Sequence, residues 1–336
     1  MSIPTRKIGS ANVSAVGFGA MVIAGAYGPV TEEEMFNVLN TAHATGSTLW
    51  DTADRYGGSE EILGKWFQRT GLRGDIFLCT KVGTVIENGK PAVNGKPDYI
   101  REAVEKCLRR LQVDYIDLLY LHRADTRTPI ELSVGAMAEF VKTGKVRFLG
   151  LSEASANTLQ RAHAVHPISA VQVEYSPFTL DIEDPKIAVL EVARSLGVSI
   201  VAYSPLGRGL LTGSYNSPAD FGEKDHRLVI PKFSAANFPK ILKIVGTLAR
   251  LGAEKYNGAS SSQVALAWLL AQGPDVIPIP GTKTIKYLRD NVAAASLQLT
   301  DEDNKAIRKL AEEAEIEGER YPPGHSQHLF CETPDF

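Results

Sequence analysis

Three short runs of apolar, strand-forming residues in this chain each end at an ionisable side chain. The residues that close these runs are Asp51, Lys81 and His122, and Tyr56 follows the first of them, just ahead of two turn glycines. Parallel strands bring the residues at their carboxyl ends to one rim of a sheet. A carboxylic acid, an amine, an imidazole and a phenol at one rim are the parts of a proton-transfer site.

The four side chains have complementary chemistry. A lysine that closes a buried strand must find a counter-charge or lose its proton, and Asp51 can be that partner. A cation near Tyr56 stabilises phenolate, so we expect Lys81 to lower the pKa of Tyr56 from its reference value of about 10. His122 can hydrogen-bond a carbonyl oxygen, and the set suits protonation of an oxygen that gains charge as a hydride reaches its carbon. Taken singly, each residue also has a structural explanation, as a cap, an edge aromatic or a satisfied interior histidine.

The hydrophobic pattern predicts the elements that must position these residues. A β-hairpin is expected over 6–19, and Thr31 with Glu34 forms a capping box for the first helix. Strands are expected at 17–19, 47–51, 76–81, 115–121, 146–151, 169–173, 198–203 and 276–279. Helices are expected at 32–45, 59–69, 98–111, 130–143, 155–165, 185–196, 261–272 and 284–295.

Each of the eight predicted strands is followed by a helix, and no shift in composition marks a linker. Parallel strands buried on both faces read as near-continuous apolar runs, as most of these do. The pattern favours a (β/α)8 TIM barrel in one domain over residues 1–336, with a doubly wound sheet as the alternative.

Several segments fall outside the repeat. These are a Gly/Asn-rich loop at 83–97, a long loop insertion at 206–258, a late helix opened by Thr300, and a C-terminal tail at 315–336. The fold expected is therefore a barrel with an N-terminal hairpin and two extra helices in its C-terminal half. Long insertions after barrel strands lie where substrates bind.

Composition narrows the classes of function. With 44% hydrophobic and 22% charged residues, the chain has the composition of a soluble globular protein with a large core. No apolar run approaches the roughly 18 residues of a membrane helix, and the first residues lack a signal peptide's apolar region, so a cytoplasmic protein is expected.

The three cysteines have neither the spacing of a disulfide framework nor that of a zinc site. A net charge of -3 without a basic run gives no support for nucleic-acid or membrane binding, and no coiled-coil repeat suggests an obligatory protein partner.

Seven motifs in order make the whole chain resemble the aldo-keto reductase superfamily. They lie at 51–56, 80–81, 121–123, 150–155, 172–176, 203–209 and 279–283. The match is closest to the branch that contains pyridoxal reductase and related aldehyde and ketone reductases, including residues 320–324. The resemblance implies an NADPH-dependent reductase of a small carbonyl compound. In that family the positions of Asp51, Tyr56, Lys81 and His122 form the catalytic tetrad, with Tyr56 as the acid.

The resemblance also implies a binding site for NADP(H). Ser152 and Gln172 fall where the family holds the nicotinamide carboxamide, and Tyr203 where an aromatic ring stacks on the nicotinamide. The pyrophosphate loop corresponds to Ser204, Pro205, Leu206, Gly207, Arg208 and Gly209. Gly281, Thr282 and Lys283 match the site of the 2′-phosphate and ribose, and a helix N-terminus with a lysine suits a phosphate. Tyr287, Asp290 and Asn291 would face the adenine.

Two positions depart from the family pattern, and a second function stays open. Glu153 stands where much of the superfamily has Asn, and Arg289 where relatives often carry an acidic residue. Cytoplasmic subunits of potassium channels share the barrel, the tetrad and the nucleotide site, so a non-catalytic NADP-sensing subunit is the alternative. A short-chain dehydrogenase is disfavoured because no Tyr is followed four residues later by Lys. A Rossmann enzyme is disfavoured because residues 17–22 lack the third glycine of its fingerprint.

Overall fold

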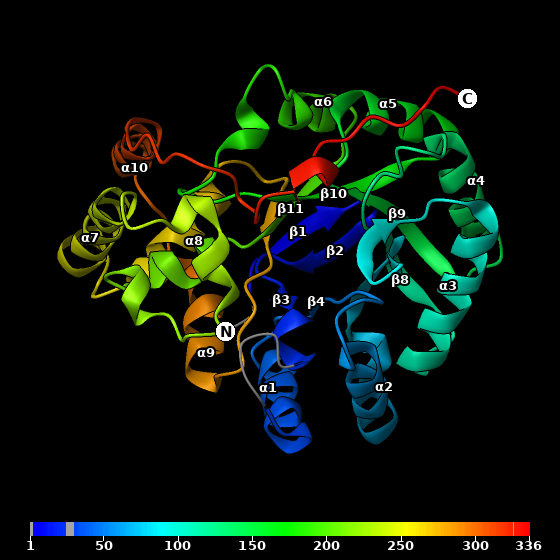
Figure 1. Ribbon diagram of the computed structural model, residues 1–336. Coiled ribbons are helices and arrows are strands. Elements are labelled where there is room, and N and C mark those ends of the chain that lie inside the picture. Colours follow the sequence, from blue (N-terminus) through cyan, green and yellow to red (C-terminus); the bar gives the residue numbers. More distant parts are fainter. Residues whose placement is uncertain (1–2, 25–29, 325) are drawn as a thin grey trace.

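A closed ring of parallel strands forms the centre of the computed structural model, which describes residues 3–24, 30–324 and 326–336 (Figure 1). Within these residues the eight-stranded sheet has the order β3-β4-β5-β8-β9-β10-β11-β12, and neighbouring strands are parallel. The strands are β3 (Phe18–Gly19), β4 (Leu49–Asp51), β5 (Phe77–Val82), β8 (Ile116–Leu121), β9 (Val146–Ser152), β10 (Ile168–Glu174), β11 (Ser199–Tyr203) and β12 (Val276–Pro278). The N–H groups of Gly17 and Gly19 donate to the carbonyls of Pro278 and Pro280 over 2.9 and 3.3 Å, which closes the barrel.

A helix follows each barrel strand and packs outside the ring (Figure 1). These helices are α1 (Glu32–Ala44), α2 (Ser59–Thr70), α3 (Pro97–Leu111), α4 (Ile130–Lys142), α5 (Ala156–Val165), α6 (Val189–Ser195), α8 (Ser261–Ala271) and α9 (Ile285–Ala293). Their apolar faces and the outer face of the sheet form one continuous core cluster. The predicted (β/α)8 barrel is therefore confirmed. None of the described helices is both long and apolar enough to cross a membrane.

The N-terminal hairpin closes the amino end of the barrel. Strands β1 (Thr5–Ile8) and β2 (Ala11–Ser14) pair antiparallel, as expected. Ile8 and Val13 pack with the interior side chains of the barrel strands. Arg6 donates to the carbonyls of Leu270 and Gly273 over 2.8 and 2.5 Å. A site inside this barrel therefore has to lie at the carboxyl ends of the strands.

The two extra helices are present in the C-terminal half. They are α7 (Phe238–Lys255) and α10 (Asp301–Glu313), on the left of Figure 1. The insertion at 206–258 is thus not only a loop, because it holds α7 and the short 3₁₀ turns η4 (Gly207–Thr212), η5 (Pro218–Asp220), η6 (His226–Val229) and η7 (Pro231–Phe233).

Two other expectations need correction. The segment 83–97, expected as a loop, contains an antiparallel hairpin of β6 (Thr84–Glu87) and β7 (Lys90–Val93). Asn88 and Gly89 form its turn with φ of 51° and 76°, and Asn-Gly is the preferred pair for such a turn. The helix expected at 185–196 begins only at Val189, because residues 184–187 form a turn closed by the Ile187 N–H on the Asp184 carbonyl.

Candidate active site

The alternation of side chains along the strands explains why the predicted residues meet. Asp51, Lys81 and His122 each stand two positions after a residue that packs inside the barrel. Those interior residues are Leu49, Cys79 and Tyr120. Because every second side chain of a strand points to the same face, the three site residues face the barrel axis one layer nearer its carboxyl end.

Lys81 is the centre of the cluster and is completely buried. Its Nζ donates to a carboxylate oxygen of Asp51, to the carbonyl of Thr52 at 2.8 Å and to the Tyr56 hydroxyl at 3.4 Å. An ammonium group has three donors and no acceptor, so all three are directed. Since the Tyr56 oxygen accepts from Lys81, its own proton is left to point at another acceptor.

Asp51 is held from both sides. One carboxylate oxygen pairs with Lys81, and the other accepts from Nε2 of Gln172 at 2.7 Å. Burial raises the pKa of Asp51, and Lys81 opposes that shift. Burial by itself would lower the pKa of Lys81, but Asp51 and Tyr56 together outweigh it, so the pKa of Lys81 is raised. Lys81 therefore stays charged.

The pKa of Tyr56 is shifted in the direction opposite to the one predicted from the sequence. We expected Lys81 to bring the pKa of Tyr56 below its ordinary value, but the pKa of Tyr56 is raised. Burial of the phenol is the largest cause and outweighs the lowering effect of Lys81, while Asp51 adds to the rise. Tyr56 thus stays protonated at neutral pH, which is the form that a general acid needs.

His122 lies against Tyr56, with ring centroids 5.8 Å apart and planes at 83°. Burial, followed by the cations Arg123 and Lys81, holds the pKa of His122 well below its ordinary value, so the imidazole is neutral. Its Nδ1 atom is buried and has no hydrogen-bond partner among the described residues. Buried polar atoms are normally paired, so this orphan atom beside the acid indicates a place for a bound molecule.

The residues expected around a nicotinamide lie at or near the carboxyl ends of the next three strands. Ser152 ends β9, Gln172 lies in β10 and Tyr203 ends β11, so the barrel brings them to the same rim as the tetrad. Ser152 Oγ accepts from Arg123 at 3.1 Å. The Tyr203 hydroxyl donates to Glu153 at 2.8 Å and lies 3.0 Å from the hydroxyl of Tyr321.

Three residues at this rim were not assigned a role from sequence. They are Arg123, Arg320 and Tyr321. Arg320 forms ion pairs with Glu153, which explains the departure from Asn because this carboxylate balances a buried arginine. Arg123 lies in the motif at 121–123 and the other two in the match at 320–324, so the signal was in the sequence without a role attached to it.

The loop at 204–209, expected to hold a pyrophosphate, is a series of tight turns. Ser204, Gly207, Arg208 and Gly209 adopt left-handed φ values of 47°, 56°, 54° and 95°. The N–H groups of Gly207 and Gly209 donate to the carbonyls of Ser204 and Leu206 over 2.9 and 3.0 Å, so the turns are closed within the loop. The two glycines have no side chain and would let a pyrophosphate approach the backbone closely. The Arg208 side chain pairs with Glu174 at 3.5 Å and lies 4.6 Å from the centre of the Tyr321 ring, so the backbone is the part of the loop suited to the anion.

Residues 281–283 lead into the N-terminus of α9. Its cap residue, Thr284, makes no side-chain capping bond, which leaves the first N–H groups of the helix for a phosphate beside Lys283. Of the three residues expected near an adenine, Tyr287 is 53% exposed and Asn291 is 4% exposed, while Asp290 is intermediate.

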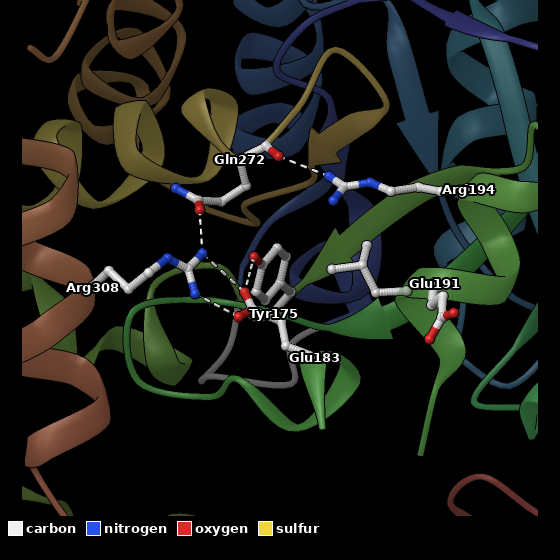
Figure 2. A pocket seen from close by; sticks show the side chains of 7 residues that line it. Tyr175, Glu183, Glu191, Arg194, Gln272 and Arg308 are labelled. Carbon is white, nitrogen blue, oxygen red and sulfur yellow. Dashed lines mark hydrogen bonds and ion pairs between the residues drawn. The ribbon is translucent and has the colours of Figure 1, made fainter. Parts of the chain in front are cut away.

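Figure 2 shows a separate cavity, which has a volume of about 430 Å³. It is lined by Tyr175, Glu183, Leu190, Glu191, Arg194, Gln272 and Arg308, and no predicted site residue is among them. Arg308 pairs with Glu183 at 2.5 Å and Arg194 with Asp275 at 2.9 Å, so its two cations are already balanced. Within the described residues no group of three or more His, Cys, Asp or Glu is arranged to hold a metal ion.

The fold and the site define a (β/α)8 barrel protein with a buried Asp-Lys-Tyr-His cluster at the carboxyl ends of its strands. The chain belongs to the aldo/keto reductase family, whose family model matches residues 15–312, and it is thereby an oxidoreductase.

Similar proteins agree with this family. Over 326 residues the chain is 61% identical to aldo-keto reductase str7 of Strobilurus tenacellus, covering 95% of each chain. Over 338 residues it is 49% identical to aldo-keto reductase yakc [NADP(+)] of Schizosaccharomyces pombe, covering 99% of each. The structure of the glycerol dehydrogenase AKR11B4 from Gluconobacter oxydans superposes with a TM-score of 0.85 at 31% identity, covering 95% of this chain and 98% of that one.

Proposed function

We propose that this chain is an NADP-dependent carbonyl reductase in which Tyr56 protonates the oxygen of an aldehyde or ketone. The observation that carries the proposal is the hydrogen bond that Lys81 Nζ donates to the Tyr56 hydroxyl oxygen at 3.4 Å. This contact fixes the phenol and leaves its proton for a substrate oxygen. NADPH, when bound, would supply the hydride that reaches the carbonyl carbon.

Each of the other tetrad residues has one role in this proposal. Asp51 balances the charge of Lys81, and Gln172 holds the second oxygen of Asp51 so that the carboxylate cannot turn away. Lys81 orients Tyr56 and stabilises the phenolate left after proton transfer. Neutral His122 donates a hydrogen bond to the substrate oxygen and stabilises the charge that develops there.

Several residues would hold the cofactor. The glycines of the turns at 204–209 would allow close approach of the pyrophosphate, and the N-terminus of α9 with Lys283 suits a 2′-phosphate, which distinguishes NADPH from NADH. Ser152 and Tyr203 would contact the nicotinamide, and Asn291 and Tyr287 the adenine. The name of the Schizosaccharomyces pombe relative includes NADP(+), which supports this choice.

The substrate class is an aldehyde or ketone small enough to reach the barrel rim. Pyridoxal belongs in a substrate panel because the sequence resembles the pyridoxal reductase branch. Glycerol belongs in the reverse direction because a structural neighbour is a glycerol dehydrogenase. Aromatic and aliphatic aldehydes complete the panel.

The test of this function is Tyr56→Phe. The substitution removes one hydroxyl and no ring volume, so NADPH affinity measured by fluorescence titration should stay within a few-fold. Single-turnover oxidation of bound NADPH by an excess of aromatic aldehyde should fall roughly a hundred- to ten-thousandfold, because a positioned general acid is lost.

The same experiment distinguishes the reductase from the alternative function. If wild type and Tyr56→Phe oxidise NADPH equally slowly across the whole carbonyl panel while both bind it, the tetrad performs no chemistry. The NADP-sensing subunit would then replace the reductase.

A further inference from the structure

The C-terminal tail places two side chains at the rim of the proposed nicotinamide site. Arg320 is 5% exposed, and its guanidinium lies 3.1 Å from Glu153, 3.3 Å from Glu174 and 2.9 Å from Asp181. Tyr321 follows directly, and its ring lies under the guanidinium of Arg208. Figure 1 shows the tail, in red, crossing beside β10 and running past α5.

One chain of contacts leads from the tail to the ring expected to stack on the nicotinamide. Arg320 donates to Glu153, and Glu153 accepts from the Tyr203 hydroxyl at 2.8 Å. Tyr203 also meets the Tyr321 hydroxyl at 3.0 Å. The Tyr203 ring is thereby held at its hydroxyl by one barrel residue and one tail residue.

A second chain of contacts leads from the tail to the expected carboxamide ligand. Arg123 donates to the Tyr321 hydroxyl at 3.4 Å and to Ser152 Oγ at 3.1 Å. A guanidinium has donors only, so Ser152 must accept from it. The proton of the Ser152 hydroxyl is therefore directed elsewhere and is available to a carboxamide oxygen.

The tail is also anchored beside these residues. The Phe330 N–H donates to the Glu153 carbonyl at 2.8 Å, and the Ser155 N–H donates to the Cys331 carbonyl at 3.3 Å. Further along, Arg161 donates to the Thr333 carbonyl at 3.0 Å. The tail thus runs along the segment that contains Ser152 and Glu153 at the end of β9.

We propose that Arg320 and Tyr321 are positioning residues of the nicotinamide subsite, so that docking of the C-terminal tail and binding of the nicotinamide half of NADP(H) are coupled. This inference rests on the proposed function for the identity of the cofactor. Coupling between two binding events is reciprocal. NADPH therefore strengthens tail docking by the same factor by which tail docking strengthens NADPH binding.

The experiment compares NADPH with 2′-phospho-ADP-ribose, which lacks the nicotinamide. Dissociation constants for both are measured by titration calorimetry on wild type, Tyr321→Phe and Arg320→Met. A hydrogen bond in a charged network contributes roughly tenfold or more to an equilibrium constant, so Arg320→Met should weaken NADPH about tenfold or more, and Tyr321→Phe a few-fold. Affinity for 2′-phospho-ADP-ribose should not change.

The matched control is Phe336→Ala, at a tail residue that is 84% exposed and far along the chain from both positions. It should alter neither affinity. Hydrogen exchange supplies a second measurement, since NADPH should slow exchange in the tail peptides of the wild-type protein and 2′-phospho-ADP-ribose should not.

The inference is overturned if Tyr321→Phe and Arg320→Met bind both ligands as wild type does, or lose affinity for both equally. If Arg320→Met does not fold, the isosteric Tyr321→Phe and the exchange measurement on wild type decide. Failure of the proposed function gives a different result: NADPH does not bind, or it binds with the expected discrimination and no carbonyl compound oxidises it.

Discussion

Among the buried charges at the barrel rim, Lys81 has the most direct effect on the proposed chemistry. It touches the proposed acid Tyr56, its counter-charge Asp51 and a backbone carbonyl, with no donor left over. Because burial has already raised the pKa of Tyr56, any loss of this cation would raise it further.

Lys81→Met tests that role. We expect carbonyl reduction at neutral pH to fall by roughly a hundredfold or more, because Tyr56 becomes a poorer acid and loses its orientation. In the oxidation direction, which needs the phenolate, the pH profile should move to higher pH. Kinetic profiles in both directions measure this, with Lys65→Met, at a 54% exposed lysine, as the control. An unchanged rate and profile in Lys81→Met would contradict the proposed tuning.

The carboxyl group of Asp54 is expected to make the stability of the protein depend on pH. Burial, followed by the nearby Glu60, raises the pKa of Asp54 to about 7, and its Oδ1 has no partner among the described residues. The unfolded value is about 3.9, so between these values the folded state holds the proton more tightly. The stability from this group is therefore complete at low pH and is lost as pH rises toward 7 and above.

Asp54→Asn removes this titration. As the pH rises from 4 to 8, the free energy of unfolding of the variant should increase by about 2 kcal/mol relative to that of wild type. This is half of what the pKa shift alone would give, because water screens the charge. Urea unfolding at a series of pH values gives the difference curve. A difference curve for Asp54→Asn that does not change with pH would refute the assigned pKa.

At the scale of elements, the added helix α7 is held to the barrel by close backbone contact with the segment leading into α8. A Cβ on Gly252 would lie 1.9 Å from the carbonyl oxygen of Ala259. Gly246, six residues earlier on the same helix, has open space at that position. The two glycines therefore separate the effect of packing from that of helix propensity.

Gly252→Ala should lower the free energy of unfolding by about 1–3 kcal/mol, because the contact has to open. Gly246→Ala should raise it by about 0.5–1 kcal/mol, because alanine is the better helix former. Denaturant titrations of the two variants and wild type measure both changes. Equal stability of the two variants would mean that α7 does not pack against α8 in this way.

At the scale of the molecule, the extra helices and the barrel share one core. A single cluster of buried apolar residues runs from Phe18 in β3 to Ile307 in α10. Arg308 of α10 also reaches across to Glu183 in η3 (Asp181–Glu183) and to Gln272 at the end of α8 (Figure 2). These contacts link segments that lie outside the barrel repeat to the barrel itself.

We therefore expect the chain to unfold in one cooperative transition. Its tryptophans are buried in β4, α2 and α8, so their fluorescence reports on both halves, while far-ultraviolet circular dichroism reports on all helices. The two transitions in urea should have the same midpoint. A second transition seen by one probe alone would show that the insertion or the tail unfolds separately.

The sequence by itself was enough to predict the barrel and the positions of the four tetrad residues within it. Alternating apolar runs and helical periods identify the strands and helices, and the two-residue repeat of a strand places Asp51 and Lys81 on the inner face. The prediction from sequence missed the hairpin around Asn88 and the start of α6. At both places short-range turns, and not the hydrophobic periodicity, determine the backbone.

The pKa of Tyr56 and the partners of Glu153 were decided only by the tertiary structure. The motif puts a cation near Tyr56, but the net direction of the pKa shift depends on how much water the whole surrounding structure removes from the phenol. Glu153 pairs with Arg320, 167 residues later in the chain. No local spacing specifies such a pair, because it forms only when the closed barrel and the docked tail bring the two segments together.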